Sequence, residues 1–204
     1  MAKEQGVFIV LEGGDRAGKT TQAKALCIAL KKEGEDVEEL SFPRYYDCGT
    51  ASMMREIRSN PSIPKTLWGK RERHLLFALN RFEAMEKMNR FLNSGKTIVC
   101  DRYHHSGVAY SVANGLEREW CETVEQDHLE PDLIIYLRVP AEEASSRRGF
   151  GTGLHETTDF QKKVTAEYDK LLIPSETVKI VDGASKSREE VAAEILALVQ
   201  QLKQ

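Results

Sequence analysis

Residues 13–20 read Gly-Gly-Asp-Arg-Ala-Gly-Lys-Thr, which fits the phosphate-binding pattern G-x-x-x-x-G-K-[ST] at every fixed position. The apolar run Val-Phe-Ile-Val-Leu at 7–11 precedes the motif, and a helical pattern follows it. In such a strand–loop–helix unit the loop N–H groups wrap a nucleotide β-phosphate. Lys19 then reaches the β and γ oxygens, and the Thr20 hydroxyl holds Mg²⁺. The motif predicts triphosphate binding and leaves the reaction open.

Size and composition narrow the class of protein. The chain has 204 residues, 41% hydrophobic and 30% charged, which suits one soluble domain spanning 1–204. A formal net charge of -3 gives no reason to expect nucleic-acid binding. No apolar run approaches the roughly 20 residues of a membrane span, and the N-terminus lacks a signal-peptide core. We therefore expect a cytoplasmic protein without membrane attachment, whose four cysteines are reduced thiols.

Apolar runs and helical patterns alternate along the whole chain. Strands are expected at 7–11, 37–42, 97–101, 132–138 and 177–181, and helices at about 18–33, 50–58, 67–94, 105–112, 116–127, 141–147, 158–172 and 187–203. The strands are apolar at consecutive positions, which indicates burial on both faces. This order predicts an α/β fold with a five-stranded parallel sheet between helical layers. Ligands then bind where the strands end.

Charged residues follow two of these strands. Residues 42–45 read Phe-Pro-Arg-Tyr, and Arg44 could grip a phosphate, although a plain surface turn is the more common explanation. Asp101 and Arg102 follow the third strand. An aspartate there is usually a helix cap, but beside a phosphate loop it is expected to organise Mg²⁺. Small residues at 106 and 107 would let a sugar approach closely.

The long helix at 67–94 carries a separate pattern. Leu75, Leu79 and Phe82 share one face, which we expect to pack on the sheet. Phe77 and Arg81 are four residues apart and lie roughly opposite that face. An aromatic ring beside an arginine suits stacking and hydrogen bonding to a planar base. A subunit interface, or an arginine lying over a satellite core, explains the pair equally well.

Two further segments suggest phosphoryl transfer. Residues 147–158 contain three glycines in five positions after two arginines, which favours a mobile lid over an ordinary loop. Asp15 and Arg16 lie inside the phosphate loop, where a generic loop needs neither. An arginine there can stabilise charge that develops on a transferred phosphoryl group.

Taken together, these blocks resemble thymidylate kinase, in the eukaryotic-like form with an arginine in the phosphate loop. The likeness covers essentially all 204 residues and rests on segments 11–22, 42–45, 75–83, 101–110, 131–133 and 181–185. It implies the three-layer P-loop nucleoside monophosphate kinase fold. It also implies transfer of the γ-phosphate of ATP to dTMP with Mg²⁺, which gives dTDP for dTTP biosynthesis. Members are commonly homodimers, so we expect a homodimer.

The resemblance also implies site residues. ATP is expected at Gly13, Gly14, Ala17, Gly18, Lys19, Thr20, Thr21, Arg147 and Ala184. dTMP is expected at Asp15, Phe42, Pro43, Arg44, Tyr45, Phe77, Arg81, Arg102, Ser106, Gly107, Tyr110, Glu156 and Gln161. The implied catalytic residues are Asp15, Arg16, Lys19 and Arg102, and the implied Mg²⁺ residues are Thr20 and Asp101.

Some of these roles are specific. Phe77 would stack on thymine, and Arg81 would bond its O4 atom. Tyr110 would crowd a ribose 2′-hydroxyl, while Glu156 and Gln161 would close over the substrate. Relatives often carry an arginine where this chain has a tyrosine at position 45, so either Arg44 or Tyr45 is expected to meet the dTMP phosphate.

Two alternative functions remain, one of them from a different class of protein. A GTP-dependent switch protein shares the phosphate loop, but it needs a guanine-reading Asn-Lys-x-Asp segment, which this chain lacks. Another nucleoside monophosphate or deoxynucleoside kinase on the same fold would differ in the acceptor pocket. Phe77 and Arg81, together with residues 101–103, favour thymine.

Overall fold

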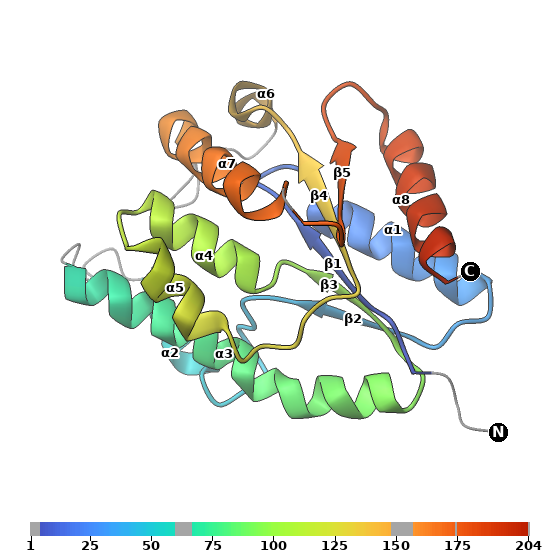
Figure 1. The fold of residues 1–204 in the computed structure, drawn as a ribbon, viewed down its shortest axis with the longest axis horizontal. Helices are drawn as coiled ribbons and strands as arrows, with labels where there is room; N and C mark the ends of the chain where they lie inside the picture. The colour runs from blue at the N-terminus through green and yellow to red at the C-terminus, as the bar shows by residue number, and fades with distance from the viewer. Residues whose placement is uncertain (1–4, 60–66, 148–156, 174, 204) are drawn as a thin grey trace.

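Five parallel strands form one sheet in the order β2-β3-β1-β4-β5 (Figure 1). The computed structural model describes residues 5–59, 67–147, 157–173 and 175–203. The strands are β1 (Phe8–Glu12), β2 (Val37–Ser41), β3 (Thr97–Asp101), β4 (Leu133–Arg138) and β5 (Val178–Asp182). Each begins and ends within one residue of its expected range, so the α/β prediction is confirmed.

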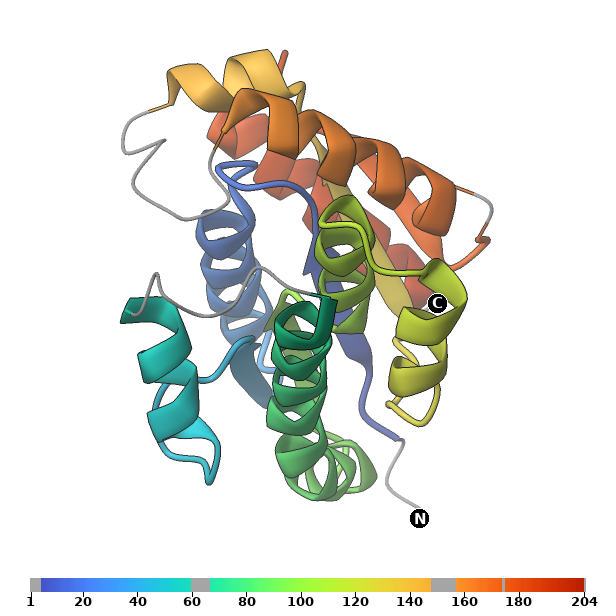
Figure 2. The same cartoon turned by 90° about the vertical axis from the view of Figure 1, so that its left-hand side faces the viewer.

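Helices cover both faces of this sheet (Figures 1 and 2). They are α1 (Lys19–Lys32), α2 (Ala51–Ser59), α3 (Leu67–Asn93), α4 (His104–Ala113), α5 (Arg118–Glu125), α6 (Ala141–Ser146), α7 (Thr158–Leu172) and α8 (Arg188–Leu202). α1 and α8 pack together on one face, whereas α3, α4 and α7 cover the other. α5 packs on α4, and α2 packs on α3. The result is a three-layer sandwich.

The central strand β1 shows why the sequence folds into three layers. Ile9 and Leu11 point into the core shared with α1 and α8, and Phe8 and Val10 point into the core under α3. All four side chains are buried, because helices cover both faces of this strand. β3 and β4 are buried in the same way, but the edge strands β2 and β5 are partly exposed. The expected two-sided burial therefore fails at the edges.

The long helix α3 faces the sheet with a different side from the one we expected. Leu75 and Leu79 are each 48% exposed, so the prediction that they pack on the sheet is wrong. The inward side carries Ala78, Arg81, Ala84, Met88 and Leu92, all buried. Small residues at 78 and 84 let the helix approach its neighbours closely, and Met88 and Leu92 fill the remaining space. In the described ranges neither this helix nor another is long and apolar enough to cross a bilayer.

Candidate active site

The phosphate loop joins the end of β1 to the start of α1, at the centre of the sheet. Gly13 has a φ of 146° and Gly18 a φ of 100°, which are values that residues with side chains rarely adopt. A Cβ atom on Gly13 would lie 2.5 Å from the Leu137 carbonyl oxygen of β4. Lys19 closes the loop by donating from Nζ to the Gly14 carbonyl at 2.6 Å. Gly13 is thus required by its φ and by the close approach of β4, and Gly18 by its φ alone.

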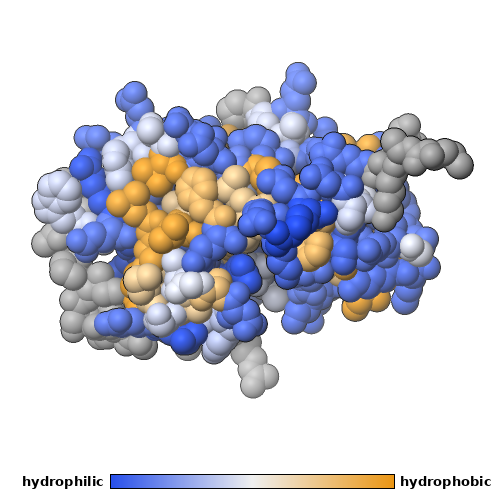
Figure 3. All heavy atoms as spheres, turned by 90° about the horizontal axis from the view of Figure 1, so that it is seen from below, coloured by the Kyte–Doolittle hydropathy of each residue, from blue (hydrophilic) through white to orange (hydrophobic). Residues whose placement is uncertain are grey.

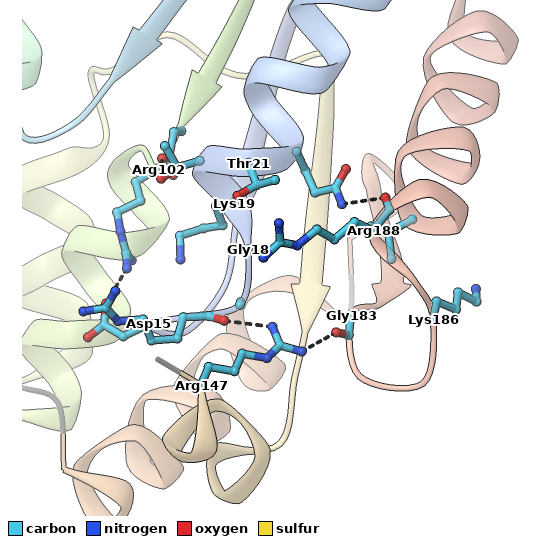
Figure 4. Close-up of a pocket in the computed structure, with 15 residues that line it drawn as sticks. Asp15, Gly18, Lys19, Thr21, Arg102, Arg147, Gly183, Lys186 and Arg188 are labelled. Atoms are coloured by element: carbon cyan, nitrogen blue, oxygen red, sulfur yellow. Dashed lines mark hydrogen bonds and ion pairs between the residues drawn. The ribbon is translucent and has the colours of Figure 1, made fainter. Parts of the chain in front are cut away.

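A cavity of about 700 Å³ opens beside this loop and α8 (Figure 4). It is lined by Asp15, Arg16, Ala17, Gly18, Lys19, Thr20, Thr21, Gln22, Asp101, Arg102, Arg147, Gly183, Lys186, Arg188 and Val191. We call it the donor cavity. Most of the residues expected at ATP lie here. Gly13, Gly14 and Ala184 do not line it, and the Ala184 N–H instead donates to Asp182 Oδ1 at 2.8 Å.

The donor cavity is strongly cationic. Lys19 is buried, and its pKa is lowered to about 8 by desolvation and by the nearby Arg102 charge. Lys186 and Arg188 add positive charge from the segment after β5, and the sequence analysis missed both. The sequence signal that could have identified them is their position after the last strand of a parallel sheet, where ligands bind. A polyanion would offset the repulsion among these cations, so the cavity suits a phosphorylated ligand.

Thr20 and Asp101 meet at the inner wall of this cavity. The Thr20 hydroxyl donates to Asp101 Oδ2, which joins the first residues of α1 to the end of β3. The other carboxylate oxygen, Asp101 Oδ1, is buried and has no hydrogen-bond partner among the described residues. A buried carboxylate oxygen without a donor, next to a hydroxyl, matches the hard oxygen ligands that Mg²⁺ prefers. These two residues therefore fit the expected metal.

A second cavity of about 560 Å³ lies under α3 and α4, and we call it the acceptor cavity. It is lined by Asp15, Arg16, Phe42, Pro43, Tyr45, Met54, Ile57, Lys70, Arg73, Phe77, Arg81, Arg102, Tyr103, Ser106, Gly107, Tyr110, Ser111, Asn114 and Leu116. Tyr45 lies in this lining. Arg44 does not, because its guanidinium donates to the Asp47 carbonyl at 2.9 Å. Three further lining residues were not identified from the sequence, because Lys70, Arg73 and Asn114 belong to no motif.

Asp15, Arg16 and Arg102 line both cavities. Arg102 donates to Asp15 Oδ1 at 2.6 Å and to the Gly13 carbonyl at 3.3 Å, which ties the end of β3 to the loop. Gln161 of α7 holds the other side of Asp15. Its amide donates to Asp15 Oδ2 at 2.8 Å and accepts from the Asp15 N–H at 2.9 Å. The junction between the cavities is therefore rigidly built.

Glu12, the last residue of β1, received no role in the sequence analysis. It is fully buried and accepts hydrogen bonds from the Tyr103 and Ser106 N–H groups, at 2.9 and 3.1 Å. It also accepts from the Ser106 hydroxyl at 2.6 Å and from the Tyr168 hydroxyl at 3.0 Å. This carboxylate fixes the start of α4 against the phosphate loop. Its position directly before Gly13 was the only sequence signal.

The expected lid is only partly described. Arg147 directly follows α6 and donates to the carbonyl oxygens of Arg16 at 2.8 Å and Gly183 at 2.6 Å, so it links the loop to the segment after β5. Figure 4 shows its side chain crossing the lower side of the donor cavity. Glu156 and the rest of 148–156 lie outside the described residues. The lid at about 147–158 stays a prediction.

Comparisons with known proteins agree with this geometry. A model of the family described as thymidylate kinase matches residues 11–195. The thymidylate kinase of Arabidopsis thaliana is 39% identical over 197 residues, covering 97% of this chain and 72% of that protein. The Dictyostelium discoideum enzyme is 35% identical and covers 96% and 85%. The solved thymidylate kinase of Candida albicans superposes with a TM-score of 0.86 at 28% identity, covering 98% and 93%. This chain belongs to the thymidylate kinase family.

Proposed function

We propose that this protein transfers the γ-phosphate of ATP to dTMP, which yields dTDP for dTTP biosynthesis. The observation that carries the proposal is the junction of two cavities at one phosphate loop. Asp15, Arg16 and Arg102 face both spaces, so one set of side chains can contact a donor and an acceptor together. A phosphoryl group held between them needs to move only a short distance. The family membership supplies the identity of the two nucleotides.

The mechanism follows from the charges that must meet. The acceptor atom is a phosphate oxygen that is already ionised at neutral pH, so no strong general base is needed. Catalysis then consists of positioning and of neutralising charge on the transferred group. Lys19 serves the donor side, and Arg16 and Arg102 serve the junction. Asp15, held by Arg102 and Gln161, orients the acceptor end.

Mg²⁺ belongs to the same proposal. Thr20 and Asp101 would hold it, since Asp101 Oδ1 has no hydrogen-bond partner among the described residues and Oδ2 accepts from the Thr20 hydroxyl. When bound, the ion would neutralise negative charge on the β and γ oxygens. Arg16 also supports our proposal that the chain is of the eukaryotic-like form, which carries an arginine in its phosphate loop.

The acceptor cavity offers contacts for a nucleoside. Phe77 supplies a half-buried ring and Arg81 a buried guanidinium on the next turn of α3. We assign stacking on thymine to the ring and a hydrogen bond to O4 to the guanidinium. Tyr110 lies at the Arg102 end, where its ring packs 5.2 Å from the Arg102 guanidinium carbon. A ring at this position would crowd a ribose 2′-hydroxyl and favour the deoxy sugar.

A coupled assay of ADP release tests this function. Purified protein with ATP and Mg²⁺ would be offered dTMP, dUMP, dGMP and AMP in parallel. We expect the largest kcat/KM with dTMP and no turnover without an acceptor. A larger value with dGMP or AMP would identify a different nucleoside monophosphate kinase. Hydrolysis that ignores every acceptor would contradict phosphoryl transfer altogether.

We also propose that two copies of the chain associate through α3. Leu75 and Leu79 are each 48% exposed and Trp68 is 70% exposed on this helix. Figure 3 looks onto the side of the molecule where α3 lies, and apolar side chains gather there. Such a patch is unusual on a monomer and suits an isologous contact. The expected lack of nucleic-acid or membrane partners and the cytoplasmic location stay predictions.

Light scattering after size-exclusion chromatography checks the association. We expect twice the chain mass for the unmodified protein and a monomer for Leu75→Glu combined with Leu79→Glu. Ile28→Glu is the matched control, because Ile28 is 57% exposed on α1, on the other side of the sheet. If the Ile28→Glu control also became a monomer, or if the unmodified protein were already a monomer, the α3 interface would be ruled out.

A further inference from the structure

A buried ion pair lies behind the acceptor cavity, between Arg81 of α3 and Glu125 of α5. The two residues are 3% and 2% exposed. Arg81 Nε donates to Glu125 Oε2 at 3.2 Å, and Arg81 Nη2 donates to Oε1, so one edge of the guanidinium is gripped by both carboxylate oxygens. We propose that Glu125 is a positioning residue that orients Arg81 for recognition of the base. This inference rests on the proposed function.

Glu125 is the group that balances the charge of Arg81. Two histidines also face the carboxylate: His128 Nδ1 lies 3.0 Å from Oε2, and His74 Nε2 lies 3.6 Å from Oε1. Burial lowers the pKa of His74 to about 4 and lowers that of His128, so both rings are neutral near pH 7. They therefore shape the space around the pair without adding charge. Without Glu125, the Arg81 cation would be buried uncompensated.

Close packing restricts the movement of this pair. Gly107 of α4 lies against it, and a Cβ atom there would be 2.5 Å from Glu125 Oε1 and 2.7 Å from Arg81 Nη2. The guanidinium is thus held by α5 on one edge and by the backbone of α4 close beside it. The Arg81 hydrogen bonds in the described part of the chain use Nε and Nη2. Nη1 is left as the donor for the acceptor cavity, which Arg81 lines.

A fixed donor has a consequence for specificity. A guanidinium has only donors, so it pairs with a base oxygen and cannot pair with an amino group at the same place. A rigid Arg81 cannot turn away from the wrong group, and the mismatch leaves buried donors unpaired. We infer that the pair selects pyrimidines with a carbonyl oxygen at position 4. The corresponding 4-amino base, 5-methylcytosine, should be rejected.

Steady-state kinetics of Glu125→Gln test this, with dTMP and 5-methyl-2′-deoxycytidine monophosphate as acceptors. The amide keeps the shape but loses the charge and one acceptor, so Arg81 is held less firmly. We expect KM for dTMP to rise and the preference for dTMP to fall, each about tenfold. KM for ATP should not change. Glu122→Gln is the matched control, because its side chain is 48% exposed on the same helix.

Two comparisons decide between possible failures. If Arg81→Ala leaves KM for dTMP and the preference unchanged, the proposed role of Arg81 at the base is wrong. If Arg81→Ala changes both and Glu125→Gln changes neither, the positioning role of Glu125 is wrong while the function survives. Glu125→Asp keeps the charge and moves it by one methylene, so it remains informative if the glutamine variant does not fold. Unchanged preference in a folded Glu125→Asp protein would then overturn the inference.

Discussion

At the scale of single residues, the fixed and the variable positions of the phosphate-loop motif have different roles. Gly13 and Gly18 adopt positive φ values, Gly13 also lets the backbone approach β4, and Lys19 supplies buried charge. Arg16 also has a positive φ, 62°, although it is not a glycine. Such a conformation is strained for a side-chain-bearing residue and is common at functional sites. It directs Arg16 to the junction of the two cavities.

Arg16→Ala tests this assignment. We expect kcat to fall by about 100- to 1000-fold, because a preorganised cation would be lost from the transferred group. KM for both substrates should change much less. Lys186→Ala is the control, since Lys186 lines the donor cavity alone. Its loss should affect KM for ATP rather than kcat. An Arg16 variant that alters only KM would show that the residue binds a substrate and does not act in the transition state.

At the scale of elements, α3 illustrates the limit of periodicity. Two of its sides carry apolar residues, and only one of them faces the sheet. The inward side includes the charged residue Arg81, so its sequence pattern looks polar. The outward side holds the apolar residues Leu75 and Leu79. A helical pattern identifies which residues share a face, but it does not say what lies opposite that face. The partner of Arg81 belongs to α5 and is 44 residues away in sequence.

Met88→Ala checks which side of α3 carries the core. Met88 is fully buried, so its truncation should lower the free energy of unfolding by about 2–5 kcal/mol. Met53→Ala in α2 is the matched control at a position that is 46% exposed, and we expect a change of about 0.5 kcal/mol or less. Urea unfolding followed by circular dichroism measures both. Equal losses in the two variants would contradict the assigned orientation of α3.

At the scale of the whole molecule, buried histidines accumulate on one side of the sheet. Burial lowers the pKa of each of His74, His104, His105 and His128, and that of His104 lies well below its usual value. The unfolded chain binds protons at these groups as the pH falls through about 6.5. The folded protein does not, so protonation favours unfolding. Glu125 and Glu130 oppose this effect, because burial raises the pKa of each carboxyl.

The free energy of unfolding should therefore fall as the pH is lowered from about 6.5 towards 5. Each histidine contributes up to about 1.4 kcal/mol per pH unit to the slope. His105→Gln should make the dependence of the unfolding free energy on pH shallower by up to that amount. Above pH 8 the variant and the unmodified protein should show the same pH dependence. Urea titrations at several pH values measure this. A stability that stays constant between pH 6.5 and 5 would show that the histidines titrate normally in the folded state.

Much of this protein is determined by local sequence. The phosphate loop and, in the described part of the chain, the five strands and eight helices follow from glycine spacing and from short-range hydrophobic patterns, which act between neighbours in the chain. Asp101 and Arg102 could be placed at the site because parallel strands end along one edge of a sheet. That rule needs only the order of the elements.

The tertiary structure decided the rest. It placed Tyr45 rather than Arg44 in the acceptor cavity, brought Lys186 and Arg188 to the donor cavity, and paired Arg81 with Glu125. No spacing in the chain encodes these contacts, because each joins elements that meet only after the helices pack. Local patterns determine which elements form. The close packing of their side chains determines which residues face one another, and here that includes Arg81 and Glu125, the pair that we propose selects the substrate.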